Sequence, residues 1–327
     1  MSEVDISKLL GWIPESEMTD DQRRIHHANV GRMPMFGLIG DTPAVGTKIL
    51  LTDTWTHSVT VQALGGEFTG WLQDTGSCVG VGGGNATQTL NCVESCLKDD
   101  VDGVVLHAWY YNYGLSRKRA GMRGRGEGSF GSTFAESIKL DGTIDADHPG
   151  LESLPNGNRD RGMFSIGQSL ELQWSDGDAI PAEVIAAAKP QQITSAPLSS
   201  FQQVRDAICN GYPVTRAGMV FVNPGSASTS NGACVGRYNG RGGHQESWLG
   251  YWNHPQLGEL IWEQNQWGQK AYERDPGGGP LGGCWIRAAE VDGFCRAQYS
   301  EVYALTAYSG YPSRPAVFDW LQSSFWS

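Results

Sequence analysis

Glycine is the residue that most constrains how this chain can fold. It accounts for 44 of the 327 residues, nearly twice the usual share of roughly 7%. Because glycine reaches positive φ angles and lets backbones approach closely, this density indicates a fold rich in tight turns and disfavours a helical bundle. The 39% hydrophobic residues, with 12 tryptophans, supply a sizeable core, so we expect an ordered protein.

The charge balance excludes several classes of partner. The formal net charge of −11 is opposite to the basic face that a general nucleic-acid binder needs. No run of about 18 apolar residues occurs, so we expect no membrane-spanning helix. Residues 1–12 do not pair a basic segment with an apolar one, so no secretory signal is expected either. We therefore expect an intracellular protein without nucleic-acid or membrane partners.

The chain contains seven cysteines, too few and too dispersed for a small disulfide scaffold. An odd number leaves at least one thiol unpaired, and a reducing compartment makes thiol reactivity the more useful question. Cys92 and Cys96 share one face of an expected helix, but a metal needs more ligands than two, so we predict no metal site and no cofactor. The cysteines are Cys78, Cys92, Cys96, Cys209, Cys234, Cys284 and Cys295.

Local patterns predict helices mainly in the first half of the chain and strands mainly in the second, which is typical of an α+β protein. Residues 1–70 lack the pair of long charged helices that a folded inhibitory propeptide would need. The expected helices are 20–29, 78–97, 132–140 and 200–210, and the expected strands are 52–61, 214–222, 244–251, 259–264 and 283–288.

Several familiar motifs fail on inspection. The stretch 126–131 matches a glycine-rich phosphate loop, but no His-Arg-Asp or Asp-Phe-Gly follows it, which excludes a protein kinase. Residues 40–48 imitate a P-loop, but Thr47 separates Gly46 from Lys48. No Gly-x-Ser-x-Gly elbow exists, so an α/β-hydrolase serine has no place.

Three separated segments together form a pattern for thiol chemistry. In 71–80 a cysteine, Cys78, opens a helix, where the partial positive charge of the helix end favours a thiolate. In 242–251 a histidine enters a strand after two glycines, and in 261–268 an asparagine closes an apolar strand. A thiolate, an imidazole that pairs with it and an amide that holds the imidazole are the groups that a cysteine peptidase needs.

The order and offsets of these residues resemble those of the papain-like cysteine peptidases. That family has Gln before Gly-Ser-Cys, then His followed by Gly-Tyr at the sixth and seventh positions, then Asn-Ser-Trp-Gly. This chain has Gln73, the run 76–78 (Gly-Ser-Cys), His244 with 250–251 (Gly-Tyr), and 265–268 (Asn-Gln-Trp-Gly). The resemblance extends in ordered blocks over residues 68–290, including a segment at 201–222 similar to bacterial-type members.

The resemblance implies a role for each matched residue. Cys78 would be the nucleophile and His244 its general base and acid. Asn265 would orient the imidazole, and Trp267 would shield that hydrogen bond from water. Gln73 would donate its side-chain amide to the oxyanion, together with the N–H of Cys78.

Two further residues, Gly128 and Ser129, occupy the place where the family presents its backbone to an extended substrate. The implied fold is α+β and papain-like, a helical N-terminal side packed against a C-terminal antiparallel sheet or barrel side, with the active-site cleft between them. We expect an N-terminal extension at 1–67, a helical half at 68–195, a β half at 196–290, and C-terminal strands with an aromatic tail at 291–327.

The sequence also departs from the family pattern. Gln73 and Cys78 are one position closer together than expected, and Val79 replaces an aromatic residue. Gln245 and Glu246 follow the histidine in place of small apolar residues, and a carboxylate in a central strand needs a partner or an opening to water.

Two functions therefore stay open. One is a cysteine peptidase that hydrolyses peptide bonds through a thioester acyl-enzyme, with a peptide or protein as substrate. The other is a weak or inactive papain-fold subunit of a larger assembly, for example a phage virion. The aromatic residues at 317–326 would then dock on a protein partner.

Overall fold

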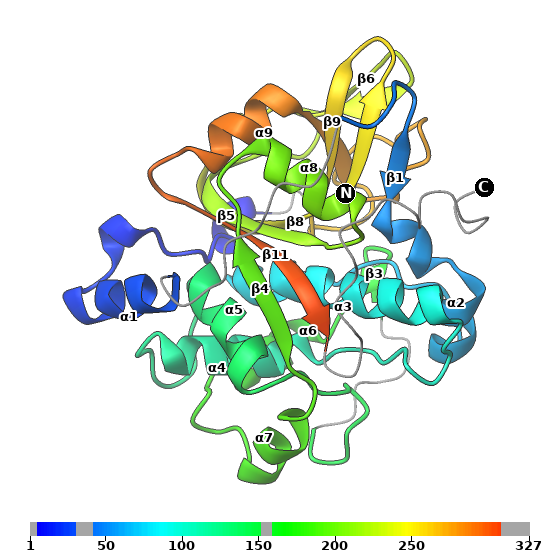
Figure 1. Cartoon of the computed structure of the whole chain (residues 1–327). Helices are drawn as coiled ribbons and strands as arrows, with labels where there is room; N and C mark the ends of the chain where they lie inside the picture. Colours follow the sequence, from blue (N-terminus) through cyan, green and yellow to red (C-terminus); the bar gives the residue numbers. More distant parts are fainter. Residues whose placement is uncertain (1–4, 31–41, 152–158, 309–327) are drawn as a thin grey trace.

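We describe a computed structural model of the chain, over residues 5–30, 42–151 and 159–308. The expected aromatic tail at 317–326 lies outside these residues. In the view of Figure 1, helices α2–α7 occupy one half of the molecule, and strands β5, β8 and β9 with α8 and α9 occupy the other. Within the described ranges, no helix is long and apolar enough to cross a membrane.

Nine α-helices lie within the described residues, and the longest, α3, is buried over nearly its whole length. Three short 3-10 helices accompany them. The α-helices are α1 (Asp20–Val30), α2 (Ser58–Leu64), α3 (Cys78–Lys98), α4 (Trp109–Arg119), α5 (Gly131–Leu140), α6 (Gly167–Trp174), α7 (Ala182–Ala188), α8 (Phe201–Cys209) and α9 (Ala288–Cys295), and the 3-10 helices are η1 (Ile6–Lys8), η2 (Glu15–Glu17) and η3 (Leu51–Trp55).

The strands form one large sheet, which is not closed, and one small pair. In the large sheet the order is β4-β11-β5-β8-β9-β10-β7-β6, and β1 also pairs with β8. The pairing is antiparallel except between β7 and β10. The strands are β1 (Lys48–Leu50), β2 (Arg159–Asp160), β3 (Met163–Phe164), β4 (Ile193–Pro197), β5 (Val214–Phe221), β6 (Ser228–Ser230), β7 (Ala233–Val235), β8 (Gly240–His254), β9 (Gly258–Gln264), β10 (Gly283–Arg287) and β11 (Ser300–Tyr308).

The predicted strand over 52–61 is wrong. The structure has η3 and α2 there, despite the alternation of threonine and valine. The His57 side chain accepts a hydrogen bond from the N–H of Val59 and caps α2, while Gly65 ends the helix with a φ of 66°. These two ends, with burial of Val59 and Thr60, outweigh the β propensity of the segment.

Helix α4 was not predicted from the sequence, because apolar and polar residues do not separate onto two faces. The helix is buried from Trp109 to Arg117, so it lacks the amphipathic pattern of a surface helix. The side chain of Arg117 donates hydrogen bonds to the carbonyls of Glu127 and Gly128, at 2.6 and 2.7 Å. It thereby fixes the loop that leads into α5. The other predicted helices and strands are confirmed, with small shifts at their ends.

The glycine run in α3 explains part of the glycine excess. A Cβ atom on Gly82 would lie 2.8 Å from the carbonyl oxygen of Gln245 on β8, and one on Gly83 would lie 2.2 Å from the ring of Phe134 on α5. Such distances are well inside van der Waals contact, so only glycine lets α3 approach both neighbours. This close approach places the beginning of α3 beside the central strand β8.

We predict that Gly83→Ala destabilises the protein by about 1–3 kcal/mol, because the added methyl group overpacks against Phe134. The matched control is Gly293→Ala in α9, where a Cβ atom would meet nothing within 4 Å. Since alanine favours a helix over glycine, the control should be neutral or stabilising by up to about 1 kcal/mol. Urea denaturation measures both, and equal effects of the two substitutions would contradict the packing of α3.

Candidate functional site

Cys78 is the first residue of α3 and is fully buried. Burial raises the pKa of its thiol to about 12, although hydrogen bonds from the backbone of Gln245, Gly11 and Trp12 oppose the shift. A helix N-terminus was expected to lower this pKa, and in the described arrangement the loss of solvent outweighs that effect. All seven cysteines lie within the described residues, and none is in a disulfide.

The loop before Cys78 is held by a buried glutamate, Glu171 of α6. Its carboxylate accepts hydrogen bonds from the N–H of Asp74 at 3.0 Å and from the hydroxyls of Thr75 at 2.7 Å and Ser77 at 2.8 Å. Because Ser77 points at Glu171, it does not cap α3. Three contacts to one carboxylate fix the approach of the chain to the cysteine. Glu171 was not predicted from the sequence, because it lies almost a hundred residues from the loop and no local pattern reports such a contact.

His244 lies on β8 and is also fully buried. Its Nε2 is 3.4 Å from Oδ1 of Asn265, and its ring stacks on that of Trp267, with centroids 4.5 Å apart and planes at 24°. The Nδ1 atom has no hydrogen-bond partner within the described part of the chain. Burial, and secondarily the charge of Arg216, lower the pKa of His244 well below its usual value.

Gln73 faces this group from the loop before α3. Its side-chain amide donates hydrogen bonds to the carbonyls of Leu9 and, at 2.7 Å, of Thr75. Its Oε1 accepts a hydrogen bond from Nε1 of Trp267 at 3.3 Å. The backbone of Gln73 also donates to the carbonyl of Gln266 at 2.9 Å, so the loop before Cys78 and the turn after β9 are joined directly.

The structure places Cys78 against β8 and joins His244, Asn265, Trp267 and Gln73 through direct contacts. Cys78 contacts the backbone of Gln245, the residue after His244. His244 lies against Asn265 and Trp267, and Trp267 in turn contacts Gln73.

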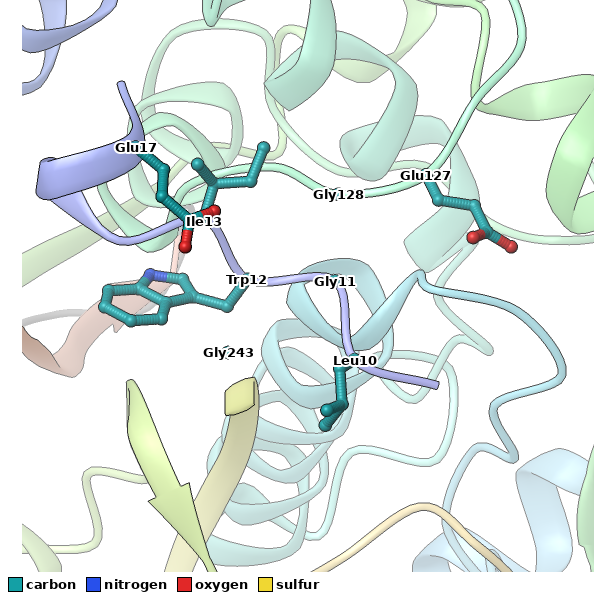
Figure 2. A pocket seen from close by; sticks show the side chains of 8 residues that line it. All are labelled: Leu10, Gly11, Trp12, Ile13, Glu17, Glu127, Gly128 and Gly243. Atoms are coloured by element: carbon teal, nitrogen blue, oxygen red, sulfur yellow. The ribbon is translucent and has the colours of Figure 1, made fainter. Parts of the chain in front are cut away.

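The site is occupied by an extended segment of the same chain, residues 9–13. The N–H of Trp12 donates to the carbonyl of Gly243 at 3.2 Å, on the histidine side. On the other side Ser129 pairs with the segment in parallel: its N–H donates to Gly11 at 2.9 Å, and its carbonyl accepts from Ile13 at 3.0 Å. Figure 2 shows the segment passing between Gly128 and Gly243. The sequence analysis did not predict this occupancy.

The segment is anchored by its tryptophan. Trp12 is buried, and its indole N–H donates to the carboxylate of Glu301 on β11 at 2.7 Å. Glu301 also accepts from the hydroxyl of Tyr303 at 3.1 Å and from the backbone N–H of Ser132 at the start of α5. Helix α5 and strand β11 therefore both hold the anchor. Beside the segment lies a pocket of about 290 Å³, lined by Leu10, Gly11, Trp12, Ile13, Glu17, Glu127, Gly128 and Gly243.

The expected substrate-facing residues Gly128 and Ser129 lie along this segment. A Cβ atom on Gly128 would come within 3.1 Å of the carbonyl oxygen of Gly11, and Gly128 has a φ of 81°. Their backbone therefore contacts an extended peptide, here one of the chain's own. In the described residues, no cluster of three or more His, Cys, Asp or Glu side chains could hold a metal ion.

Solved structures with the same fold exist, although the sequence comparisons find no relative. No protein-family model and no curated protein matches the sequence. Among solved structures, the chain is similar to xylellain, a cysteine protease from Xylella fastidiosa, with a TM-score of 0.54, 15% identity, and 91% of this chain and 96% of that chain covered. It is also similar to procathepsin B from Trypanosoma congolense, with a TM-score of 0.48, 12% identity, and 92% and 84% covered.

The expected fold is confirmed at this level. The chain has a papain-like cysteine protease fold, α+β, with a large mixed sheet. The expected barrel is not closed, because the sheet has free edges at β4 and β6. At 15% identity, the likeness to xylellain shows the fold alone.

We predict that Glu171 makes stability depend on pH. Burial raises its pKa from 4.5 to about 7, against the opposing hydrogen bonds from Thr75 and Ser77. A raised folded-state pKa stabilises the protein below the unfolded value, and this contribution is lost as the pH rises through the folded value. Relative to Glu171→Gln, the wild-type free energy of unfolding should fall by roughly 3 kcal/mol between about pH 4.5 and about pH 8. Urea denaturation at several pH values measures this difference, and a constant difference would contradict it.

Proposed function

We propose that this protein is a cysteine peptidase whose site, in the described arrangement, is closed by residues 9–13. One observation supports this most strongly: the site already holds an extended peptide. The carbonyl of Leu9 accepts a hydrogen bond from the Gln73 amide, and the backbone of Gly11 and Trp12 contacts the sulfur of Cys78. A groove that binds backbone groups on both sides suits a peptide or protein substrate.

The chemistry would be amide hydrolysis through a thioester. The Cys78 thiolate attacks the substrate carbonyl carbon, and the resulting oxyanion accepts hydrogen bonds from the Gln73 amide and the N–H of Cys78. Protonated His244 gives its proton to the leaving amine, and the C–N bond breaks. Water, deprotonated by His244, then hydrolyses the thioester and releases the acid. Asn265 and Trp267 hold the imidazole during these steps.

The closed arrangement explains the high pKa of the Cys78 thiol. With the pKa near 12, almost no thiolate exists at neutral pH. Displacement of residues 9–13 would return solvent to the sulfur and remove the main cause of the shift. We therefore infer that the described state is latent and that displacing the segment activates the site. Such latency does not require a helical propeptide, because residues 9–13 alone cover the site.

One observation favours the second function, an inactive papain-fold subunit of a larger assembly such as a virion. Glu246 is fully buried beside His244, an unusual neighbour for a thiol peptidase site. In that case residues 9–13 would close the site permanently.

The test weakens the segment and then removes the nucleophile. Trp12→Ala deletes the hydrogen bond to Glu301. Since a hydrogen bond to a carboxylate is worth roughly 1.5–3 kcal/mol, this loss should raise the fraction of chains with an open site at least about tenfold. Hydrolysis of a fluorescent casein should rise by the same factor. Adding Cys78→Ala to this chain should abolish hydrolysis, whereas adding Cys295→Ala, at the partly buried thiol that ends α9, should leave it unchanged.

Controls separate the two functions. Lys8→Ala changes an exposed side chain just before the segment and should leave hydrolysis at the wild-type level. Hydrolysis that persists after Cys78→Ala would contradict the assigned nucleophile. A folded Trp12→Ala chain that cleaves no protein or peptide library would favour the structural subunit.

A further inference from the structure

A buried charge cluster lies directly beside His244, on one face of the sheet. Because side chains alternate along a strand, His244 and Glu246 on β8 point to the same face. Arg216 of β5 is the cross-strand partner of Glu246, and Glu263 of β9 completes the cluster. The side chains of all four residues are at most 1% exposed.

Among the described residues, Arg216 is the one permanently charged cation that forms ion pairs with these two carboxylates. It binds Glu246 and Glu263, and its guanidinium lies 4.8 Å from the ring centres of both Tyr238 and Phe294. One arginine facing two carboxylates leaves an excess of one negative charge if both are ionised. An unbalanced buried charge is costly, so a further cation or a proton must be close by.

The two carboxylates are not equivalent. Glu263 accepts hydrogen bonds from Arg216 Nε, from the Tyr238 hydroxyl and from Trp248 Nε1, at 2.8–3.0 Å, all through Oε2. Glu246 binds Arg216 through Oε2 and turns Oε1 towards His244, 3.8 Å from Nε2. Within the described residues Oε1 of Glu246 and Oε1 of Glu263 both lack a hydrogen-bond partner, and the Oε1 of Glu246 is the one that lies beside the imidazole.

We propose that Glu246 is a positioning residue for His244: together with Asn265 it holds the proton of the imidazole on Nε2 and stabilises the imidazolium. This leaves Nδ1, which has no hydrogen-bond partner among the described residues, as the nitrogen available to act as a base. This inference rests on the proposed function and deepens it. The imidazolium balances the excess carboxylate, and the pair of Glu246 and His244 carries one proton between them. A carboxylate attracts an imidazolium more strongly than the neutral amide of Asn265 does.

Other groups around the pair act on the same proton. Burial, and secondarily the charge of Arg216, oppose protonation of His244. Burial and Glu263 raise the pKa of Glu246, while the charge of Arg216 and hydrogen bonds from Arg216 and Asn265 oppose that rise and favour the carboxylate. Asn265, as a neutral donor and acceptor, contacts both partners. Among the described residues, the other titratable groups that interact with the cluster are Tyr238, Tyr272, Cys284 and Cys78. Burial raises the pKa of each, and Glu246 raises that of Cys78 further, so all four stay neutral in the closed arrangement.

The test reads the imidazole directly by ¹⁵N NMR of the histidine-labelled full chain between pH 4 and pH 9. In the wild type, His244 should carry its neutral-state proton on Nε2. In Glu246→Gln, which keeps the shape but loses the charge, the pKa of His244 should fall by about one unit or more, a tenfold loss of proton affinity. The matched control Glu263→Gln removes a charge from the same cluster on the side away from His244 and should shift that pKa less.

Equal His244 pKa values in the wild type and Glu246→Gln would overturn the proposal, as would a ring that stays neutral to pH 4 in both. If Glu246→Gln does not fold, the tautomer of His244 in the wild type provides the test. A neutral ring with its proton on Nδ1 and an unprotonated Nε2 would also overturn the proposal. The readout needs no peptide cleavage. A chain with the expected shift but no peptidase activity would therefore reject the proposed function and keep the role of Glu246.

Discussion

The close contact between helix α3 and strand β8 is the constraint on which the rest of the structure depends. The Ser247 hydroxyl donates to the Gly82 carbonyl at 2.6 Å, and any Cβ on Gly82 would collide with the Gln245 carbonyl. A helix that approaches a strand this closely brings its first residue, Cys78, beside the residues around His244. A larger side chain in the glycine run would separate the two, and the candidate site would lose its geometry before any reacting group was changed.

On this frame the site combines two kinds of burial. The thiol is buried against residues 9–13, which the proposed activation would displace. The Arg216 cluster is buried by the sheet and the aromatic rings around it, which stay in place. Burial by residues 9–13 determines whether the Cys78 thiol can ionise, and burial of the Arg216 cluster determines how strongly His244 holds a proton. The proposed latent peptidase needs a reversible burial of the thiol and a fixed environment for the imidazole.

The sequence predicted the parts of the fold that local motifs encode, and it offered candidate site residues on the same basis. The segments around Cys78, His244 and Asn265 each carry their own pattern of glycines and aromatic residues, so their residues could be named without coordinates. The anchor of Trp12 on Glu301 joins residues 289 positions apart, and no local pattern reports such a contact. The predicted strand over 52–61 failed because helix caps at His57 and Gly65 outweighed the β propensity.

Arg216 was a signal that the sequence did carry, because it is the one charged residue in the strand Val214–Phe221. With Glu246 in the next strand of the sheet, a buried pair could have been inferred, although not its contact with His244, which depends on the strand register.

Covalent labelling of the full-length chain by an E-64-type epoxide, with the modified residue mapped by mass spectrometry, tests the paired thiol and imidazole most directly. A single adduct on Cys78 is predicted, formed slowly in the wild type, faster in Trp12→Ala, and lost when His244→Gln is added to Trp12→Ala. Labelling of Cys78 in Trp12→Ala that is no faster than that of the other thiols, or that is unchanged by His244→Gln, would contradict an activated Cys78–His244 pair.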